Sequence, residues 1–372
     1  MTLYPNLILE ALSHVRYPGK GQDIVSLGMV QDNIRIEGNK VSFSLIFEKP
    51  NDPFIKSLIK AAEQAVLTYV GKEVDIKGNI TAVYKKEIPA AKENSILPGV
   101  KNIIAVFSGK GGVGKSTIAA NLAVALASLG YKVGLLDADI HGPSIPKMFG
   151  LEDARPYMEE IDGRELILPI EKYGIKLLSI GFFVDPDNAL VWRGSMASNA
   201  LKQLITDAHW DELDYFIMDL PPGTGDIHLT LVQTMGITGA IVVTTPQDVA
   251  LADARKGINM FTNEKVNVPV LGLVENMAWF TPAELPENKY YIFGKEGGKR
   301  LAEEFNIPLL GQIPIVQSIR ESGDAGKPIA TEEDSILSIS FRQLAENVVD
   351  AVEQRNKIME KTKKVEINHP RK

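Results

Sequence analysis

The feature that most constrains this chain is the glycine-rich string GKGGVGKST at residues 109–117. It contains the pattern G-x-x-x-x-G-K-[ST], and it stands between an apolar run at residues 103–107 and an amphipathic segment at residues 117–129. Glycines let successive backbone N–H groups turn toward phosphate oxygens, and a helix beginning there adds partial positive charge. Both flanking contexts that the motif requires are present. The string therefore predicts a phosphate-binding loop between a buried strand and a helix.

The residues of this loop have expected roles in holding a nucleotide. Lys115 is expected to reach the β- and γ-phosphates, and the Ser116 hydroxyl to ligate Mg²⁺. ATP with Mg²⁺ is thus the expected ligand. The predicted nucleotide-binding residues of the loop are Gly109, Lys110, Gly111, Gly112, Val113, Gly114, Lys115, Ser116 and Thr117.

The segment around this loop predicts an α/β fold, a doubly wound and mostly parallel sheet. Short apolar runs alternate with amphipathic segments, which is typical of strands buried on both faces. The expected strands are residues 103–107, 133–136, 177–180, 215–218, 240–243, 270–274 and 309–313. The expected helices are residues 117–129, 195–207, 249–261, 296–305 and about 335–359.

A second pattern precedes the loop and predicts a small N-terminal α+β domain. Helical spacing over residues 6–15 gives way to alternation, then to an amphipathic helix opened by Pro53 and a further alternating run, in the order αββαβ. A chain of 372 residues is also longer than one core usually organises. We expect a small domain at residues 1–84, a linker at 85–98, a P-loop domain at 99–360 and a polar tail at 361–372.

Two acidic positions end apolar strands after the loop, where ligands collect in open α/β sheets. Asp219 is interpreted as the carboxylate that holds Mg²⁺ through water. The glycines of the following segment, residues 220–226, can present backbone amides to a γ-phosphate. The other position is the pair Asp137 and Asp139, for which a structural role of Asp137 is as plausible as a catalytic one.

Adenine contacts are expected after the sixth and seventh strands. An Asn amide, here Asn276, can both donate to and accept from the adenine edge, and Pro314 can pack on the ring. The alternative for Asn276 is an ordinary loop amide.

Composition excludes several functions. The chain has no cysteine, so it carries no disulfide, catalytic thiol or thiolate ligand for an iron-sulfur cluster. With 40 basic and 47 acidic side chains and a net charge of -7, it is not expected to bind nucleic acid. No secretory signal or bilayer-spanning apolar run is visible, so we expect a cytoplasmic protein that does not bind membranes.

A second lysine within the loop, Lys110, has no role in an ordinary phosphate loop. With it, the string resembles the deviant loop of the family that includes MinD, ParA, the arsenite-pump ATPase and the nitrogenase iron protein. In that family the extra lysine reaches the partner subunit's nucleotide. The resemblance implies an ATP-closed homodimer and an ATPase whose catalytic residues are Lys110, Lys115 and Asp139, with Asp139 orienting the attacking water.

Within that group the chain is most similar to the Mrp/ApbC branch, which carries iron-sulfur clusters. The N-terminal domain resembles SufT-type assembly factors through residues 23–30, DIVSLGMV. The resemblance implies homodimers that serve iron-sulfur client or scaffold proteins. Seven strings carry it in order over about residues 101–329: GKGGVGKST, DADIHGPS, WRG, DLPPGTGD, TPQ, ENM and IFG.

The departure from this family lies after the ENM string. Mrp-type proteins usually carry C-x-x-C there and hold a bridging [4Fe-4S] cluster between two subunits, whereas this chain has AWFTPAELP at residues 278–286. A lesser departure is Ser195, where proline is usual. Three functions stay open: cluster delivery with ligands from a partner or from a site such as Glu284, a cluster-free ATP-dependent dimer switch of the MinD or ParA kind, and a small-molecule kinase.

Overall fold

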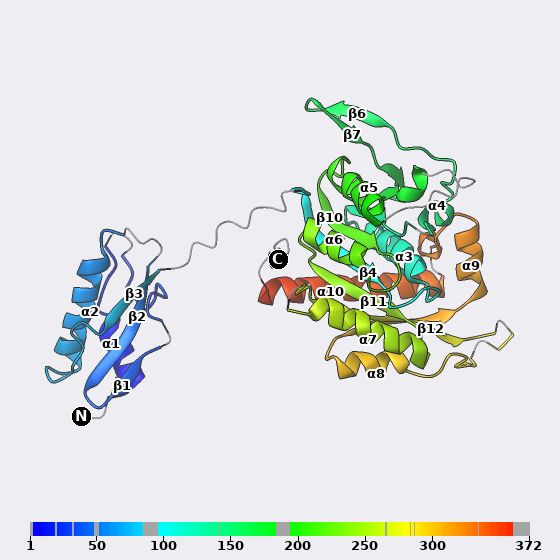
Figure 1. The fold of residues 1–372 in the computed structure, drawn as a ribbon. Helices are drawn as coiled ribbons and strands as arrows, with labels where there is room; N and C mark the ends of the chain where they lie inside the picture. Colours follow the sequence, from blue (N-terminus) through cyan, green and yellow to red (C-terminus); the bar gives the residue numbers. More distant parts are fainter. Residues whose placement is uncertain are drawn as a thin grey trace, which may run out of the picture. The chain divides into compact units, whose positions relative to one another are not determined.

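The computed structural model describes residues 3–18, 21–31, 33–47, 52–84, 96–140, 142–183, 194–264, 266–282, 284–285, 287–333 and 335–359. The chain divides into two compact units, Met1–Lys92 and Glu93–Lys372, each of which is described by itself (Figure 1). Most of the expected linker and the expected polar tail lie outside the described residues.

The N-terminal unit is a three-stranded sheet with two helices. Its sheet has the order β1-β2-β3, antiparallel between the first pair and parallel between the second. Gly38, with φ +62°, makes the tight turn between β1 and β2. The apolar residues of β2 and the facing helices form a separate core. The elements are α1 (Pro5–Leu12), β1 (Arg35–Glu37), β2 (Lys40–Phe47), α2 (Ile55–Tyr69) and β3 (Ile80–Tyr84).

The larger unit is built on an eight-stranded sheet of order β13-β12-β11-β4-β10-β5-β9-β8. All neighbours are parallel except β8 and β9. The sheet confirms the predicted mostly parallel α/β fold, and its central strands are apolar because helices cover both faces. The strands are β4 (Val100–Phe107), β5 (Val133–Asp137), β8 (Ile170–Lys172), β9 (Ile175–Ser179), β10 (Leu213–Asp219), β11 (Gly239–Thr244), β12 (Val270–Phe280) and β13 (Leu309–Ile315).

The chain order places a topological switch point at β4. From β4 the chain passes through α3 toward β5, whereas from β11 it passes through α7 toward β12, on the other side of the sheet order. Because crossovers are right-handed, α3 and α7 lie on opposite faces. The loop after β4 therefore opens where ligands bind in such sheets. The helices are α3 (Lys115–Ser128), α4 (Ile145–Met148), α5 (Gly194–Thr206), α6 (Asp226–Thr234), α7 (Asp248–Thr262), α8 (Gly297–Glu304), α9 (Gln317–Asp324) and α10 (Ile336–Ile358), with short 3-10 turns η1 (Ile180–Phe182) and η2 (Ile329–Thr331).

Several elements differ from the sequence prediction. A hairpin of β6 (Met158–Ile161) and β7 (Arg164–Ile167) projects from the unit in Figure 1, and its residues lie mostly at the surface, so apolar periodicity gave no signal. The helix α9 has no buried residue and was missed for the same reason. The strand β12 continues to Phe280, six residues beyond its predicted end. Of the described helices, none has the length and apolar character needed to cross a membrane.

Candidate nucleotide-binding site

The loop between β4 and α3 has the backbone shape that the glycine string predicts. Gly112 and Gly114 both have φ +80°, which residues with a Cβ rarely adopt, and Gly114 is the N-cap of α3. A Cβ placed on Gly111 or Gly112 would meet no atom within 4 Å. The loop thus leaves open space beside its glycines at a helix N-terminus, where an anion is favoured.

Gly109 and Gly114 lie at close contacts between the loop and the rest of the unit. A Cβ on Gly109 would lie 2.1 Å from the carbonyl carbon of Asp253 in α7. One on Gly114 would lie 2.2 Å from Nδ2 of Asn276. These contacts require glycine, so the loop is wedged between α7 and the end of β12.

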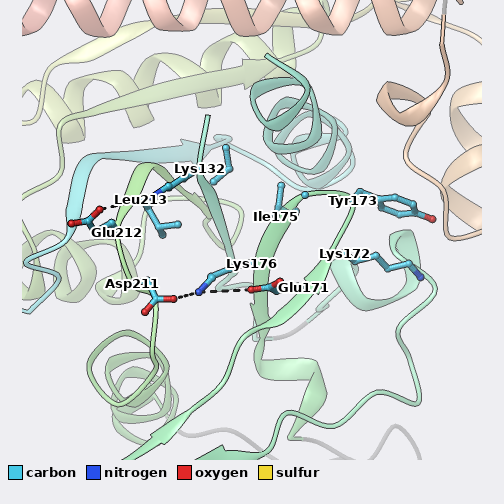
Figure 2. Close-up of a pocket in the computed structure, with 11 residues that line it drawn as sticks. Lys132, Glu171, Lys172, Tyr173, Ile175, Lys176, Asp211, Glu212 and Leu213 are labelled. Atoms are coloured by element: carbon cyan, nitrogen blue, oxygen red, sulfur yellow. Dashed lines mark hydrogen bonds and ion pairs between the residues drawn. The ribbon is translucent and has the colours of Figure 1, made fainter. Parts of the chain in front are cut away.

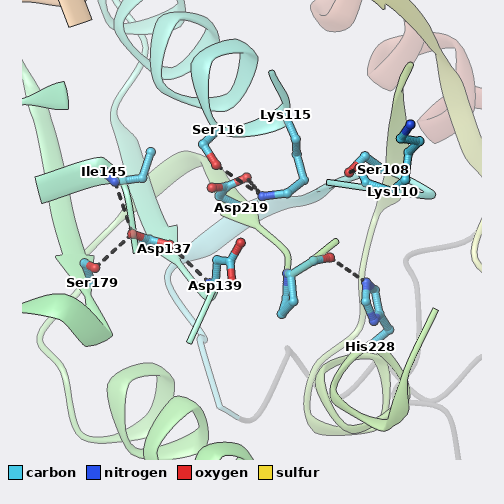
Figure 3. Close-up of polar contacts among 11 residues, drawn as sticks. Ser108, Lys110, Lys115, Ser116, Asp137, Asp139, Ile145, Ser179, Asp219 and His228 are labelled. Atoms are coloured by element: carbon cyan, nitrogen blue, oxygen red, sulfur yellow. Dashed lines mark hydrogen bonds and ion pairs between the residues drawn. The ribbon is translucent and has the colours of Figure 1, made fainter. Parts of the chain in front are cut away.

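The basic group of the loop faces the carboxylate at the end of β10. Lys115 and Asp219 are both buried, and Lys115 Nζ forms an ion pair with Asp219 Oδ1. The same ammonium donates to Ser116 Oγ at 3.3 Å. Figure 3 shows the three side chains pointing toward one another, so residues about a hundred positions apart form one cluster.

The arrangement at Asp219 fits a divalent cation. Its Oδ2 is buried and has no hydrogen-bond partner among the described residues, whereas Oδ1 is paired with Lys115. Burial raises the pKa of this carboxyl, against the opposing effect of Lys115, because a charge removed from water is unfavourable without compensation. A carboxylate oxygen and a hydroxyl are ligands that Mg²⁺ prefers. Asp219 Oδ2 and the Ser116 hydroxyl could therefore together hold a magnesium ion.

The two carboxylates after β5 have different surroundings. Asp137 is fully buried and accepts hydrogen bonds from the Ser179 hydroxyl at 2.9 Å, from the Asp139 amide at 3.1 Å and from the Ile145 amide at 3.3 Å. Burial, followed by the charge of Asp219, raises the pKa of Asp137 to about 8. Asp139 is half-buried, and its carboxylate points toward Asp219 in Figure 3. Asp137 therefore positions the backbone of Asp139, which favours the structural interpretation of Asp137.

Lys110 lies apart from this cluster. It is half-buried, and its amino group points away from Lys115 and Asp219 in Figure 3. The Lys110 carbonyl accepts a hydrogen bond from the buried Ser108 hydroxyl at 2.9 Å, and the Ser108 carbonyl accepts one from the Gly223 amide at 2.9 Å. The phosphate loop and the loop after β10 are thus joined through Ser108, a residue the sequence analysis did not single out.

The predicted adenine contacts line one cavity. A hollow of about 440 Å³ beside the N-terminal turns of α3 is lined by Thr117, Asn276 and Pro314, among others. Asn276 is buried, and its Nδ2 donates to the Val113 carbonyl at 2.8 Å. Its amide nitrogen therefore holds the phosphate loop, which leaves Oδ1 to face other donors.

Described residues of the segment that follows the ENM string contact one another. Phe280 and Tyr290 exchange two backbone hydrogen bonds of 2.8 Å, and Lys289 Nζ lies 4.0 Å from the Trp279 ring centroid. Leu285 is 48% exposed. Among the described residues, no three His, Asp or Glu side chains come together as a metal site.

A further cavity, of about 580 Å³, lies at the opposite edge of the sheet, at the first residues of β5, β9 and β10 (Figure 2). Most of its charged side chains pair with one another, as in the Lys176 ion pairs with Asp211 and Glu171. Because most of these charges are already paired, the nucleotide-side cavity is the stronger candidate site.

Residues 99–349, more than half of the chain, match the family described as NUBPL iron-transfer P-loop NTPase, and residues 6–77 match the family described as iron-sulfur cluster assembly protein. An iron-sulfur cluster carrier protein from Synechocystis is 43% identical over 337 residues, covering 90% of this chain and 94% of the relative. One from Haemophilus influenzae is 51% identical over 346 residues, covering 92% and 90%.

Among solved structures, the chain is similar to a nucleotide-binding protein from Archaeoglobus fulgidus in complex with ADP. The two are 38% identical with a TM-score of 0.55, over 64% of this chain and 92% of the other.

Proposed function

Because the chain belongs to the NUBPL-type iron-transfer P-loop NTPases, the family of the iron-sulfur cluster carrier proteins, we propose that it binds ATP with Mg²⁺ in the loop at residues 109–117 and hydrolyses it. The observation that carries this proposal is the cluster of Lys115, Ser116 and Asp219 at the switch point of the sheet, in which Asp219 Oδ2 has no hydrogen-bond partner within the described part of the chain.

Each residue of the cluster would have its own role in binding the nucleotide and Mg²⁺. The ammonium of Lys115, at the first position of α3, would exchange Asp219 for the β- and γ-phosphates. Ser116 Oγ would hold Mg²⁺ directly and Asp219 through water. Bound Mg²⁺ supplies charge neutralisation of the phosphate oxygens. Thr117, Asn276 and Pro314 would contact the nucleoside side, since they line the adjoining cavity.

Hydrolysis would need a positioned water and a second positive charge. Asp139, half-buried and with its backbone fixed by Asp137, is proposed to orient the water. Lys110, which has no carboxylate partner among the described residues, is proposed to serve the nucleotide of a second copy, so that ATP closes a homodimer in the cytoplasm. An arginine finger, the analogous device, is worth roughly 10³ to 10⁵ in rate.

The biological role that this ATPase supports best is iron-sulfur cluster assembly or transfer. Both family matches and the named relatives support it. Since this chain has no cysteine, a [4Fe-4S] cargo would be held by ligands of a scaffold or client protein. The same lack of cysteine favours a second candidate, an ATP-dependent dimer switch that carries no cluster.

A transfer assay separates the two roles. A cluster-loaded donor and a cysteine-bearing apo-acceptor would be mixed with this chain, with and without ATP, and acceptor activation followed, with Lys115→Ala as the matched control. Acceleration that needs both ATP and Lys115 supports cluster transfer. If ATP drives dimer formation by light scattering but leaves transfer unchanged, the switch is the correct function.

A further inference from the structure

His228 is a buried histidine that the proposed mechanism does not use. It lies in the first turn of α6 and is 1% exposed, beneath a loop whose residues Pro222, Thr224 and Gly225 are exposed. Its ring meets Phe261 of α7 edge-on, with centroids 6.5 Å apart. The ring thus underlies the loop that follows Asp219.

Both ring nitrogens are engaged by that loop. Nδ1 accepts a hydrogen bond from the Gly225 amide at 3.2 Å, and Nε2 lies 3.0 Å from the Pro221 carbonyl oxygen. A carbonyl only accepts and an amide only donates, so the ring is the neutral tautomer with its proton on Nε2. Burial lowers the pKa of His228, which agrees with a neutral ring.

The two hydrogen bonds of the ring lie on either side of the residue through which the loop after β10 contacts the phosphate loop. Between Pro221 and Gly225 stands Gly223, whose φ is +91° and whose amide donates to the Ser108 carbonyl at 2.9 Å. Ser108 in turn donates to the Lys110 carbonyl at 2.9 Å. The His228 ring is therefore linked to Lys110 by hydrogen bonds that are connected through the backbone of residues 221–225 and through Ser108.

A helix cap alone does not account for this arrangement. The bond from the Gly225 amide to Nδ1 is the usual third-residue half of a capping box. The bond from Nε2 to Pro221 reaches beyond the helix to the residue two positions after Asp219. The bond to Pro221 therefore holds the loop before the helix, and capping the helix does not require this bond.

We propose that His228 is a positioning residue, which holds residues 221–225 in the shape that links them through Ser108 to the phosphate loop and Lys110. The inference rests on the proposed ATPase function. The described contacts of the His228 ring are to the loop and to Phe261. Loss of the His228 side chain should therefore lower kcat and leave the KM for ATP and the affinity for ADP nearly unchanged.

Variants separate the two bonds. In His228→Asn the side-chain oxygen replaces Nδ1 and keeps the cap, whereas the Pro221 bond is lost. In His228→Gln the amide nitrogen replaces Nε2 and keeps that bond. We expect kcat to fall about tenfold in His228→Asn, the worth of one hydrogen bond, at least as far in His228→Leu, which loses both bonds, and to be close to wild type in His228→Gln. His14→Asn, in the N-terminal unit, is the matched control and should match wild type. A kcat for His228→Asn equal to that of wild type would overturn the proposal.

Amide hydrogen exchange of Gly223 gives a readout independent of turnover. Its amide should be protected in wild type and in His228→Gln, and should exchange at least about tenfold faster in His228→Asn and His228→Leu. Equal protection in wild type and in His228→Asn would overturn the inference. Absence of ATP turnover in the wild type would instead refute the proposed function, and the exchange measurement would still decide the role of His228.

Discussion

Replacing Gly109 with alanine tests whether the phosphate loop is wedged against α7. The added Cβ would lie 2.1 Å from the carbonyl carbon and 2.3 Å from the carbonyl oxygen of Asp253, both backbone atoms, whereas ordinary contact begins at 3.4 Å. The φ of Gly109 is outside the positive range, so packing is the only strain. Overpacking of this kind costs about 1–3 kcal/mol. We expect Tm to fall by roughly 3–10 °C.

Gly111→Ala is the matched control for this measurement. It adds the same methyl group to the same loop, where no atom lies within 4 Å, and its φ is also outside the positive range. Both substitutions gain the same unfolded-state entropy term, so the difference isolates the contact with α7. Thermal unfolding without nucleotide, followed by calorimetry, gives the two values. Equal Tm for Gly109→Ala and Gly111→Ala would refute the reasoning.

Three further changes test other parts of the account. Lys110→Ala should leave ATP binding intact and remove ATP-driven dimerisation and turnover, as light scattering and phosphate release would show; a dimer that still forms with ATP contradicts the role in trans. Asp139→Asn should keep ATP bound and slow hydrolysis at least tenfold in single-turnover assays; normal turnover removes Asp139 from the catalytic set. Burial lowers the pKa of His228 from 6.5; the charge of Lys115 lowers it further, whereas the bonds to Pro221 and Gly225 and the charge of Asp139 raise it. The ring of the unfolded chain therefore binds its proton at a higher pH than the ring of the folded chain. Urea unfolding from pH 8 to 5 should therefore show wild type losing up to about 1.4 kcal/mol per unit below pH 6.5 relative to His228→Gln, and parallel curves would contradict it.

What the sequence predicts well here is local. The loop at 109–117 needs glycine at fixed offsets because two of its residues have positive φ. Such a requirement is visible in the sequence because the residues concerned lie close together in it. Buried parallel strands likewise appear as apolar runs, so the seven core strands were predicted. Asp137 was left open because its role depends on Ser179, 42 positions away.

Side-chain bonds across the fold escaped prediction. The Asn276 amide joins Val113 over 163 positions, and neither residue type nor spacing reveals that pairing. The pairing of both His228 nitrogens is visible only once the loop after β10 folds over the ring. A histidine two residues after a G-x-G-D string was the available signal. The strands of the β6 and β7 hairpin are short and mostly at the surface, so no periodicity marked them.

The most direct test of the central claim is calorimetric titration of the purified chain with ATP in the presence of Mg²⁺, beside Lys115→Ala. The wild type should bind one nucleotide per chain, and the variant should give no measurable heat, because the ammonium that faces the phosphates is gone. An equal titration curve for the two proteins, or none for the wild type, would contradict the account.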